Sequence, residues 1–109
     1  QTTQTELERQ FGARVAGIVL EVTDDASLHW QDRKQAQIDH ARHLSFPAQQ
    51  VKLADKICNL RDVATDPPHD WDLGRRRRYF DWAKAVIDGM KTPDPALLAI
   101  FRETYGRKP

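Results

Sequence analysis

Cysteine is almost absent from this sequence of 109 residues, and its single copy, Cys58, excludes a disulfide within the chain. A chain so poor in cysteine is typical of a reducing compartment, because disulfides persist mainly in oxidising ones. The sequence also lacks any apolar run near the roughly 20 residues that span a bilayer, and it shows no signal peptide. We therefore expect a cytoplasmic protein without a membrane partner.

A large excess of one charge is missing as well. The chain has 17 lysines and arginines against 16 aspartates and glutamates, which gives a net charge of +1. This balance argues against a protein that coats nucleic acid, so we expect no nucleic-acid partner. The arginine run at 75–78 leaves one alternative open, which is an unrelated basic helical module that binds nucleic acid.

Strand-like alternation of apolar and polar residues is absent too, and helical spacing runs through the chain. The first predicted helices cover residues 3–12, 13–22 and 28–43. A helix that begins near Pro47 and carries Asp55 follows, and the next helix covers residues 73–91. The last predicted helix has Thr92 as its N-cap and Pro93 as its first residue, and it stops at Gly106. The helix over 73–91 is expected to bury five residues: Phe80, Ala83, Val86, Ile87 and Met90. These patterns predict an all-α helical bundle that forms a single domain over residues 1–109.

Residues 51–62, with the sequence VKLADKICNLRD, form an amphipathic helix with a charged stripe. At about 3.6 residues per turn, one side collects the apolar residues Leu53, Ile57, Leu60 and Ala64, flanked by Val51, Ala54 and Cys58. The other side collects Lys52, Asp55, Asn59 and Asp62. This stripe suits a polyanion or a metal–phosphate ligand, and spacing alone leaves an ordinary solvated face open as the alternative.

The arginine run at 75–78 lies near the start of a predicted helix, where positive charge opposes the helix macrodipole. Arg75 and Tyr79 are four residues apart and therefore share one helix face. An arginine fork binds phosphate oxygens well, and a tyrosine ring packs on a ribose or a base while its hydroxyl donates. A solvated first turn is the alternative. Arg33 and Lys34 are interpreted in the same two ways, as surface charges or as a phosphate contact.

Several separate segments of this sequence resemble segments of one family and occur in the order that the family has. They are residues 3–25 (TQTELERQFGARVAGIVLEVTDD), Arg33-Lys34, His40-Ala41, VKLADKICNLRD and YFDWA at 79–83. They resemble the HD-domain hydrolases of the RelA/SpoT type, which cleave the 3′-pyrophosphate from guanosine tetra- and pentaphosphate. The pattern is most similar to the small stand-alone MESH1-like hydrolases. The resemblance covers nearly the whole chain and implies a helical bundle of the HD-domain type.

In that family a divalent metal, usually Mn²⁺, is held by an early His, an adjacent His-Asp pair and a late Asp, and a Glu-Asp pair does the acid–base work. The resemblance matches the late Asp to Asp55, and the other ligands have no counterpart in this sequence. One carboxylate does not hold a catalytic transition metal. We therefore expect the chain to be the C-terminal portion of a hydrolase domain, without catalytic residues of its own and inactive in isolation.

The histidines are not assigned to the metal. His69 and Asp70 form a literal His-Asp pair, but the pair follows the Asp55 helix in a proline-rich loop, whereas the metal pair of the family precedes that helix. His40 and His43 are three residues apart, which is compatible with metal ligands on a helix. The family does not use this position for the metal, so we interpret these two as structural or capping residues.

The resemblance also implies the substrate contacts. Asn59, Arg75 and Tyr79 are matched to nucleotide contacts, and Lys52 to a phosphate contact. Trp30 departs from the pattern, because related chains often have a basic residue there. Arg61 lies within the apolar side of the Asp55 helix, where we expect a buried ion pair.

The implied substrate is guanosine tetra- or pentaphosphate. NADPH, dephosphorylated by MESH1-like relatives, is the alternative substrate, and a non-catalytic relative that binds a nucleotide or a partner is the alternative function. A partial domain would expose apolar residues that normally pack against missing helices, with Val15, Ile18, Val19 and Ile57 as candidates. Such a surface favours self-association, so a homo-oligomer is expected.

Overall fold

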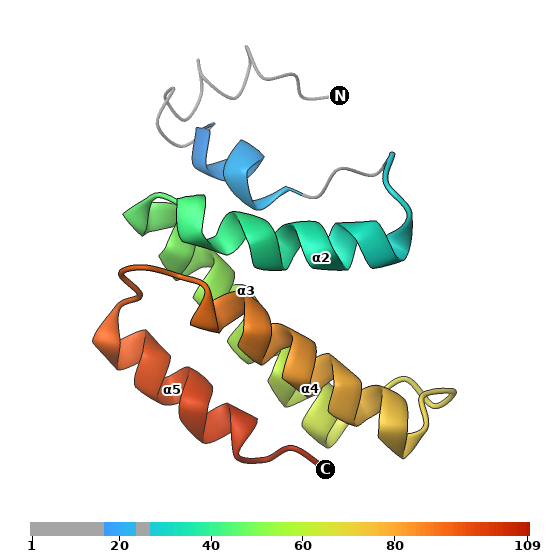
Figure 1. Ribbon diagram of the computed structural model, residues 1–109. Coiled ribbons are helices and arrows are strands. Elements are labelled where there is room, and N and C mark those ends of the chain that lie inside the picture. Colours follow the sequence, from blue (N-terminus) through green and yellow to red (C-terminus); the bar gives the residue numbers. More distant parts are fainter. Residues whose placement is uncertain (1–16, 24–26) are drawn as a thin grey trace, which may run out of the picture.

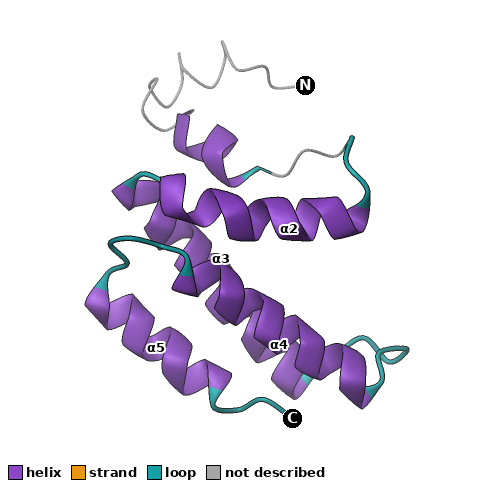
Figure 2. Ribbon diagram, viewed as in Figure 1, coloured by secondary structure: helices purple, strands orange, loops and turns teal. Residues whose placement is uncertain are grey.

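The computed structural model describes residues 17–23 and 27–109, and this part of the chain is built from helices (Figure 1, Figure 2). Residues 17–22 are helical, and they precede α2 (Trp30–His40), the short 3-10 helix η1 (Ala41–His43), α3 (Phe46–Thr65), α4 (Leu73–Asp88) and α5 (Pro95–Tyr105). No strand occurs in the described ranges, which confirms the all-α class. The predicted helix at 3–12 and the part of the next one before residue 17 lie outside the described residues.

The longest helix, α3, is the centre of the arrangement. It packs against both α4 and α5, while α2 packs against α4. Figure 1 shows α3 and α4 running side by side, with α2 on one side of them and α5 on the other. None of the described helices combines the length and the apolar character that a membrane span requires.

The core lies between α3, α4 and α5. The helix α3 contributes Leu53, Ile57, Leu60 and Val63, α4 contributes Phe80, Ala83, Val86 and Ile87, and Ala41 of η1, Met90 and Phe101 complete the cluster. The predicted buried residues of the 73–91 helix are therefore confirmed. Burying an aliphatic or phenyl side chain of this size contributes about 1.5–3 kcal/mol to folding, so this cluster accounts for the main cohesion of the bundle.

The starts of α3 and α4 are capped by side-chain oxygens. The Ser45 hydroxyl accepts from the amide of Ala48, and Pro47 lies in the first turn of α3 as predicted. The Asp72 carboxylate accepts from the amide of Arg75 at 2.7 Å at the start of α4. These bonds satisfy amide groups that have no partner inside the helix.

The predicted start of the last helix is wrong, because neither Thr92 is its N-cap nor Pro93 its first residue. Asp94 is the N-cap, with Pro95 in the first turn, and the Asp94 carboxylate accepts from the Leu97 amide at 3.0 Å. Thr92 is engaged elsewhere, because its hydroxyl accepts from the Gln49 side chain at 3.1 Å and its amide donates back to that side chain at 3.0 Å. Gly106 follows the helix as its C-cap, as predicted.

The buried side of α3 is rotated from the predicted one. Lys52 and Lys56 are 7% and 3% exposed, although Lys52 was predicted on the charged stripe opposite the apolar side. Val51, Ala54 and Cys58, predicted to widen the apolar side, are exposed instead. The reason is that partners on neighbouring segments, described below, compensate the two ammonium groups.

Two further expectations for α3 are wrong. Arg61 is exposed and not buried in an ion pair, because its side of α3 faces solvent. Ile57 is 4% exposed and belongs to the core. Of the other apolar candidates, Val19 is 39% exposed, Ile18 is half-buried, and Val15 lies outside the described residues. Self-association stays a prediction.

The contact between Gln49 and Thr92 yields a testable prediction. Gln49 is 3% exposed, and its amide joins α3 to the segment before α5 and to the Leu44 carbonyl at 3.0 Å. We expect Gln49→Leu to lower the free energy of unfolding by about 2 kcal/mol, because it leaves buried polar groups without partners. Urea denaturation followed by circular dichroism measures this loss.

The matched control is Gln35→Leu, which removes a bond from an exposed side chain to Asp39 at 3.0 Å. We expect that control to change the free energy of unfolding by less than about 0.5 kcal/mol. Equal stability of the two variants would contradict a structural role for Gln49.

Candidate functional site

Two adjoining cavities lie where α2, α3 and α4 meet. The aromatic cavity has a volume of about 730 Å³ and is lined by Trp30, Lys34, Trp71, Arg75, Arg78, Tyr79 and Trp82. The Asp55 cavity has a volume of about 520 Å³ and is lined by Val22, Arg33, Lys34, Gln37, Lys52, Asp55, Lys56, Asn59, Tyr79 and Trp82. Lys34, Tyr79 and Trp82 line both, so the two cavities form one continuous site.

The five residues predicted from the sequence all line this site. Lys52, Asp55 and Asn59 line the Asp55 cavity, Arg75 lines the aromatic cavity, and Tyr79 lines both. Four cations and one carboxylate line the Asp55 cavity, because Arg33, Lys34, Lys52 and Lys56 surround it with Asp55. A concave site with one sign of charge in excess attracts ligands of the opposite sign.

Asp55 and Asn59 are one turn apart on α3. The Asn59 side-chain amide donates to the Asp55 carboxylate at 3.3 Å, and the Lys56 ammonium lies 3.4 Å from the same oxygen. The Asp55 side chain is nevertheless 52% exposed. These contacts orient the carboxylate while leaving part of it open to a ligand.

Tyr79 reaches the same place from α4. Burial raises the pKa of the Tyr79 hydroxyl, the charge of Asp55 raises it further, and a hydrogen bond with Asn59 lowers it. A tyrosine hydroxyl is protonated at neutral pH and a raised pKa does not change this, so Tyr79 can donate a hydrogen bond to an anion. Asp55, Asn59 and Tyr79 therefore converge from two helices on one spot.

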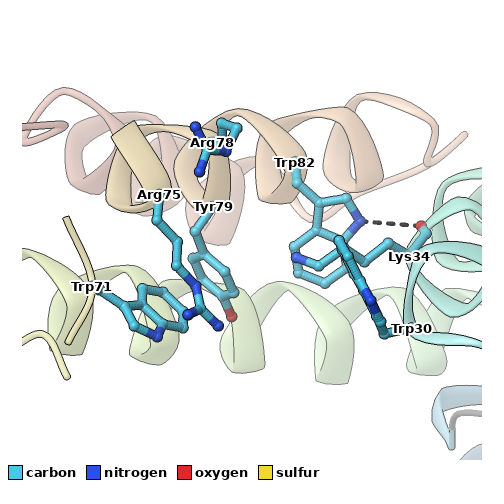
Figure 3. Close-up of a pocket in the computed structure, with 7 residues that line it drawn as sticks. All are labelled: Trp30, Lys34, Trp71, Arg75, Arg78, Tyr79 and Trp82. Atoms are coloured by element: carbon cyan, nitrogen blue, oxygen red, sulfur yellow. Dashed lines mark hydrogen bonds between the residues drawn. The ribbon is translucent and has the colours of Figure 1, made fainter. Parts of the chain in front are cut away.

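Lys34 lies at the junction of the two cavities. Its ammonium is 4.2 Å from the centroid of the Trp82 ring and 5.3 Å from that of the Tyr79 ring. The Trp82 indole N–H donates to the Lys34 carbonyl at 3.1 Å, the bond drawn in Figure 3. Burial lowers the pKa of Lys34, and the positive charge of Arg75 lowers it further. Lys34 and Arg33 are the two basic residues that the sequence left between a surface charge and a phosphate contact, and both line the Asp55 cavity.

The two buried lysines of α3 differ in their surroundings. The Lys52 ammonium donates to the Val22 carbonyl at 3.3 Å and to the Gln37 side chain at 3.5 Å. The Lys56 ammonium lies 4.2 Å from the centroid of the Trp82 ring. Sequence reasoning missed Lys56, although its spacing of four from Lys52 was a signal that both share one side of α3.

The arginine run at 75–78 divides into two pairs. Arg75 and Arg78 line the aromatic cavity, and the Arg75 guanidinium lies 4.3 Å from the centroid of the Trp71 ring. Arg76 donates to the Asp72 carbonyl at 3.4 Å, and Arg77 donates to the Pro109 carbonyl at 2.7 Å. The first pair is therefore available to a ligand in the cavity, while the second ties α4 to its own start and to the end of the chain.

The described residues do not form a metal site by themselves. His40, His43, His69 and Asp70 are exposed and line neither cavity. Within residues 17–23 and 27–109, no three His, Cys, Asp or Glu side chains gather closely enough to hold a metal ion. Asp55 thus offers one oxygen ligand group, which is fewer than a catalytic metal needs.

Comparisons with known proteins identify the family of the chain and several similar proteins. Residues 1–78 match the HD domain family. The human guanosine-3′,5′-bis(diphosphate) 3′-pyrophosphohydrolase MESH1 is 46% identical over 107 residues, which is 98% of this chain and 60% of that protein. The protein of the same name from Danio rerio is 47% identical over 96 residues, 88% of this chain and 53% of that protein.

A solved structure extends the comparison to the fold. It is that of a metazoan ortholog of SpoT that hydrolyzes ppGpp and plays a role in starvation responses, and it is 40% identical with a TM-score of 0.89. The match covers 98% of this chain and 60% of that chain. The chain spans about half the length of the curated relatives it matches. The sequence and fold matches confirm the expected resemblance, and the chain belongs to the HD domain family.

Proposed function

We propose that the chain is part of a guanosine-3′,5′-bis(diphosphate) 3′-pyrophosphohydrolase, which hydrolyses guanosine tetra- or pentaphosphate to GDP or GTP and pyrophosphate. The observation that carries the proposal is the joined site, in which Asp55, Asn59 and Tyr79 converge beside an excess of cations. The names of the relatives from five animals support the same reaction.

The chemistry of the site suits a highly charged nucleotide. Lys34 is placed to bind a phosphate at the junction of the cavities, and Arg75 and Arg78 to bind phosphates from α4. An arginine fork gives two parallel hydrogen bonds to phosphate oxygens. The Tyr79 hydroxyl and the Asn59 amide add neutral donors. These groups would hold a pyrophosphate group and disperse its negative charge, which is a major part of catalysis of phosphoryl reactions.

Membership of the HD domain family implies a divalent metal, and we propose Mn²⁺. Asp55 would supply one ligand. Because the described residues offer no cluster of three ligating side chains, they do not fit the metal alone. We therefore also propose that the chain is the C-terminal portion of its hydrolase domain, and that other segments of the whole protein supply the remaining ligands and the acid–base pair. The chain spans 60% of the human relative and 60% of the solved chain, so those proteins have further segments that could carry such ligands.

The proposed role of Asp55 can be tested with a chimeric protein. The segment of the human relative that precedes the match is joined to this chain, and pyrophosphate release from guanosine tetraphosphate is measured with Mn²⁺. We expect release by the chimera and none by the isolated chain. Asp55→Asn should reduce release by the chimera by about 100-fold or more, because the loss of a residue that only supports a metal ligand already costs about 10- to 100-fold.

The matched control is Asp62→Asn, which changes an exposed aspartate on the same helix that lines neither cavity. We expect this chimera to keep nearly full activity. A chimera that releases pyrophosphate equally well with Asp55→Asn would contradict the proposed function.

The proposed role of Lys34 predicts how the affinity for pyrophosphate depends on pH. Lys34 binds a phosphate best in its charged form, which is lost as pH rises through its pKa, and that pKa lies below the ordinary 10.5. The affinity for pyrophosphate should therefore begin to fall at lower pH than for an ordinary lysine site. Lys34→Arg should remove this fall, because the arginine charge does not titrate in this range.

Calorimetric titrations between pH 7 and about 10.5 measure the effect. Taking the ratio of the wild-type and Lys34→Arg affinities cancels the titration of pyrophosphate itself. Lys91→Arg, at an exposed lysine outside both cavities, is the control and should not change the profile. A pH profile unaffected by Lys34→Arg would rule out Lys34 as the phosphate contact.

A further inference from the structure

Trp30 has an unusual position for an exposed indole. Its side chain is 53% exposed, and it lines the aromatic cavity at the first residue of α2. The described part of the chain has seven other exposed large apolar residues, and none of them lines either cavity: Val19, Leu20, Leu28, Phe46, Val51, Leu73 and Ile100. Exposure of Trp30 therefore coincides with a site, whereas exposure of the others does not.

The other three aromatic rings of this cavity are already engaged by cations. Arg75 lies 4.3 Å from the centroid of the Trp71 ring, and Lys34 lies within 5.3 Å of the centroids of both Tyr79 and Trp82. Among the described residues no cation lies over Trp30. Its ring contact is with the preceding side chain, His29, at 5.7 Å between centroids and an interplanar angle of 37°. The Trp30 indole is thus the ring of the cavity that is available to stack on a ligand.

The neighbours of Trp30 indicate the chemistry of that ligand. Lys34 is one turn further along α2 and therefore on the same face of the helix. Figure 3 shows Trp30 and Lys34 at one end of the cavity, Trp71 and Arg75 at the other, and Tyr79 between them. A free aromatic face beside Lys34, in a cavity that is also lined by Arg75 and Arg78, matches a molecule with a planar ring and several phosphates.

We propose that Trp30 is a specificity-determining residue whose indole stacks on the base of the nucleotide substrate. The phosphates of that nucleotide extend past Lys34 toward the Asp55 cavity. This inference rests on the proposed function, because it assigns the ring of the same substrate to one wall of the site. Stacking on an aromatic side chain suits any base, since every base has a π-face. Trp30 therefore selects for the presence of a base and leaves the choice among bases to other contacts.

The test compares two probes on the full chain by calorimetry: GDP, which has a base, and inorganic pyrophosphate, which has none. Trp30→Ala should weaken GDP binding by about 5- to 150-fold, the range expected for losing one base–aromatic stack. The same variant should leave pyrophosphate binding unchanged within about twofold, because it keeps the cations. Trp30→Phe should retain most of the GDP affinity, because it keeps a stacking ring.

The matched control is Phe46→Ala. Phe46 is 54% exposed and Trp30 is 53% exposed, so the two side chains are similarly accessible to solvent. Phe46 lines neither cavity, so Phe46→Ala should bind GDP like the wild type. Circular dichroism checks that each variant keeps the helical fold.

Three results would overturn the inference: an unchanged GDP affinity in Trp30→Ala, an equal loss of GDP and pyrophosphate affinity, or a wild-type chain that does not prefer GDP to pyrophosphate. The proposed hydrolysis fails separately. A chimera that does not release pyrophosphate, combined with base-dependent binding at Trp30, would reject hydrolysis and keep the stacking role. An active chimera with Trp30-independent GDP binding would do the reverse.

Discussion

The indole of Trp82 connects the three helices whose side chains line the site. Trp82 belongs to α4, its N–H donates to the Lys34 carbonyl of α2 at 3.1 Å, and its ring lies 4.2 Å from the Lys56 ammonium of α3. A second ammonium, that of Lys34, lies at the same distance from the ring. An indole suits this position because it combines a large apolar body with one polar donor. Trp82 also lines both cavities, so its contacts fix one wall that the two cavities share.

Buried ammonium groups are the main energetic cost of the arrangement. An unpaired charge in an apolar interior is strongly unfavourable, yet Lys52 and Lys56 are both nearly inaccessible. The Lys52 ammonium donates hydrogen bonds to the Val22 carbonyl and the Gln37 side chain, and the Lys56 ammonium contacts Asp55 and the Trp82 ring. A desolvated cation over an aromatic ring contributes on the order of 2 kcal/mol, which offsets part of this cost. The same contacts keep positive charge beside Asp55, where a polyanionic substrate would benefit from it.

The candidate site combines a rigid part with an open part. Asp55, Asn59 and Tyr79 are held by contacts between α3 and α4, and Lys34 is held by Trp82. Arg78 and Trp30 line the aromatic cavity and are both exposed. Groups fixed before binding lose little freedom when a ligand arrives, so they suit the binding of phosphates in a defined geometry. The exposed side chains of Arg78 and Trp30 suit contacts that distinguish one ligand from another.

Within the described residues, the sequence by itself determined the helices, the α4 core and the pairs Asp55–Asn59 and Arg75–Tyr79, because each depends on spacing within one helix. The resemblance in VKLADKICNLRD and YFDWA also led to the correct family. Only the tertiary structure decided which side of α3 is buried, that Thr92 bonds to Gln49 instead of capping α5, and that Lys34 and Lys56 meet at Trp82. Helical spacing defines the faces of a helix, but the direction in which each face points depends on packing against residues that are distant in the sequence.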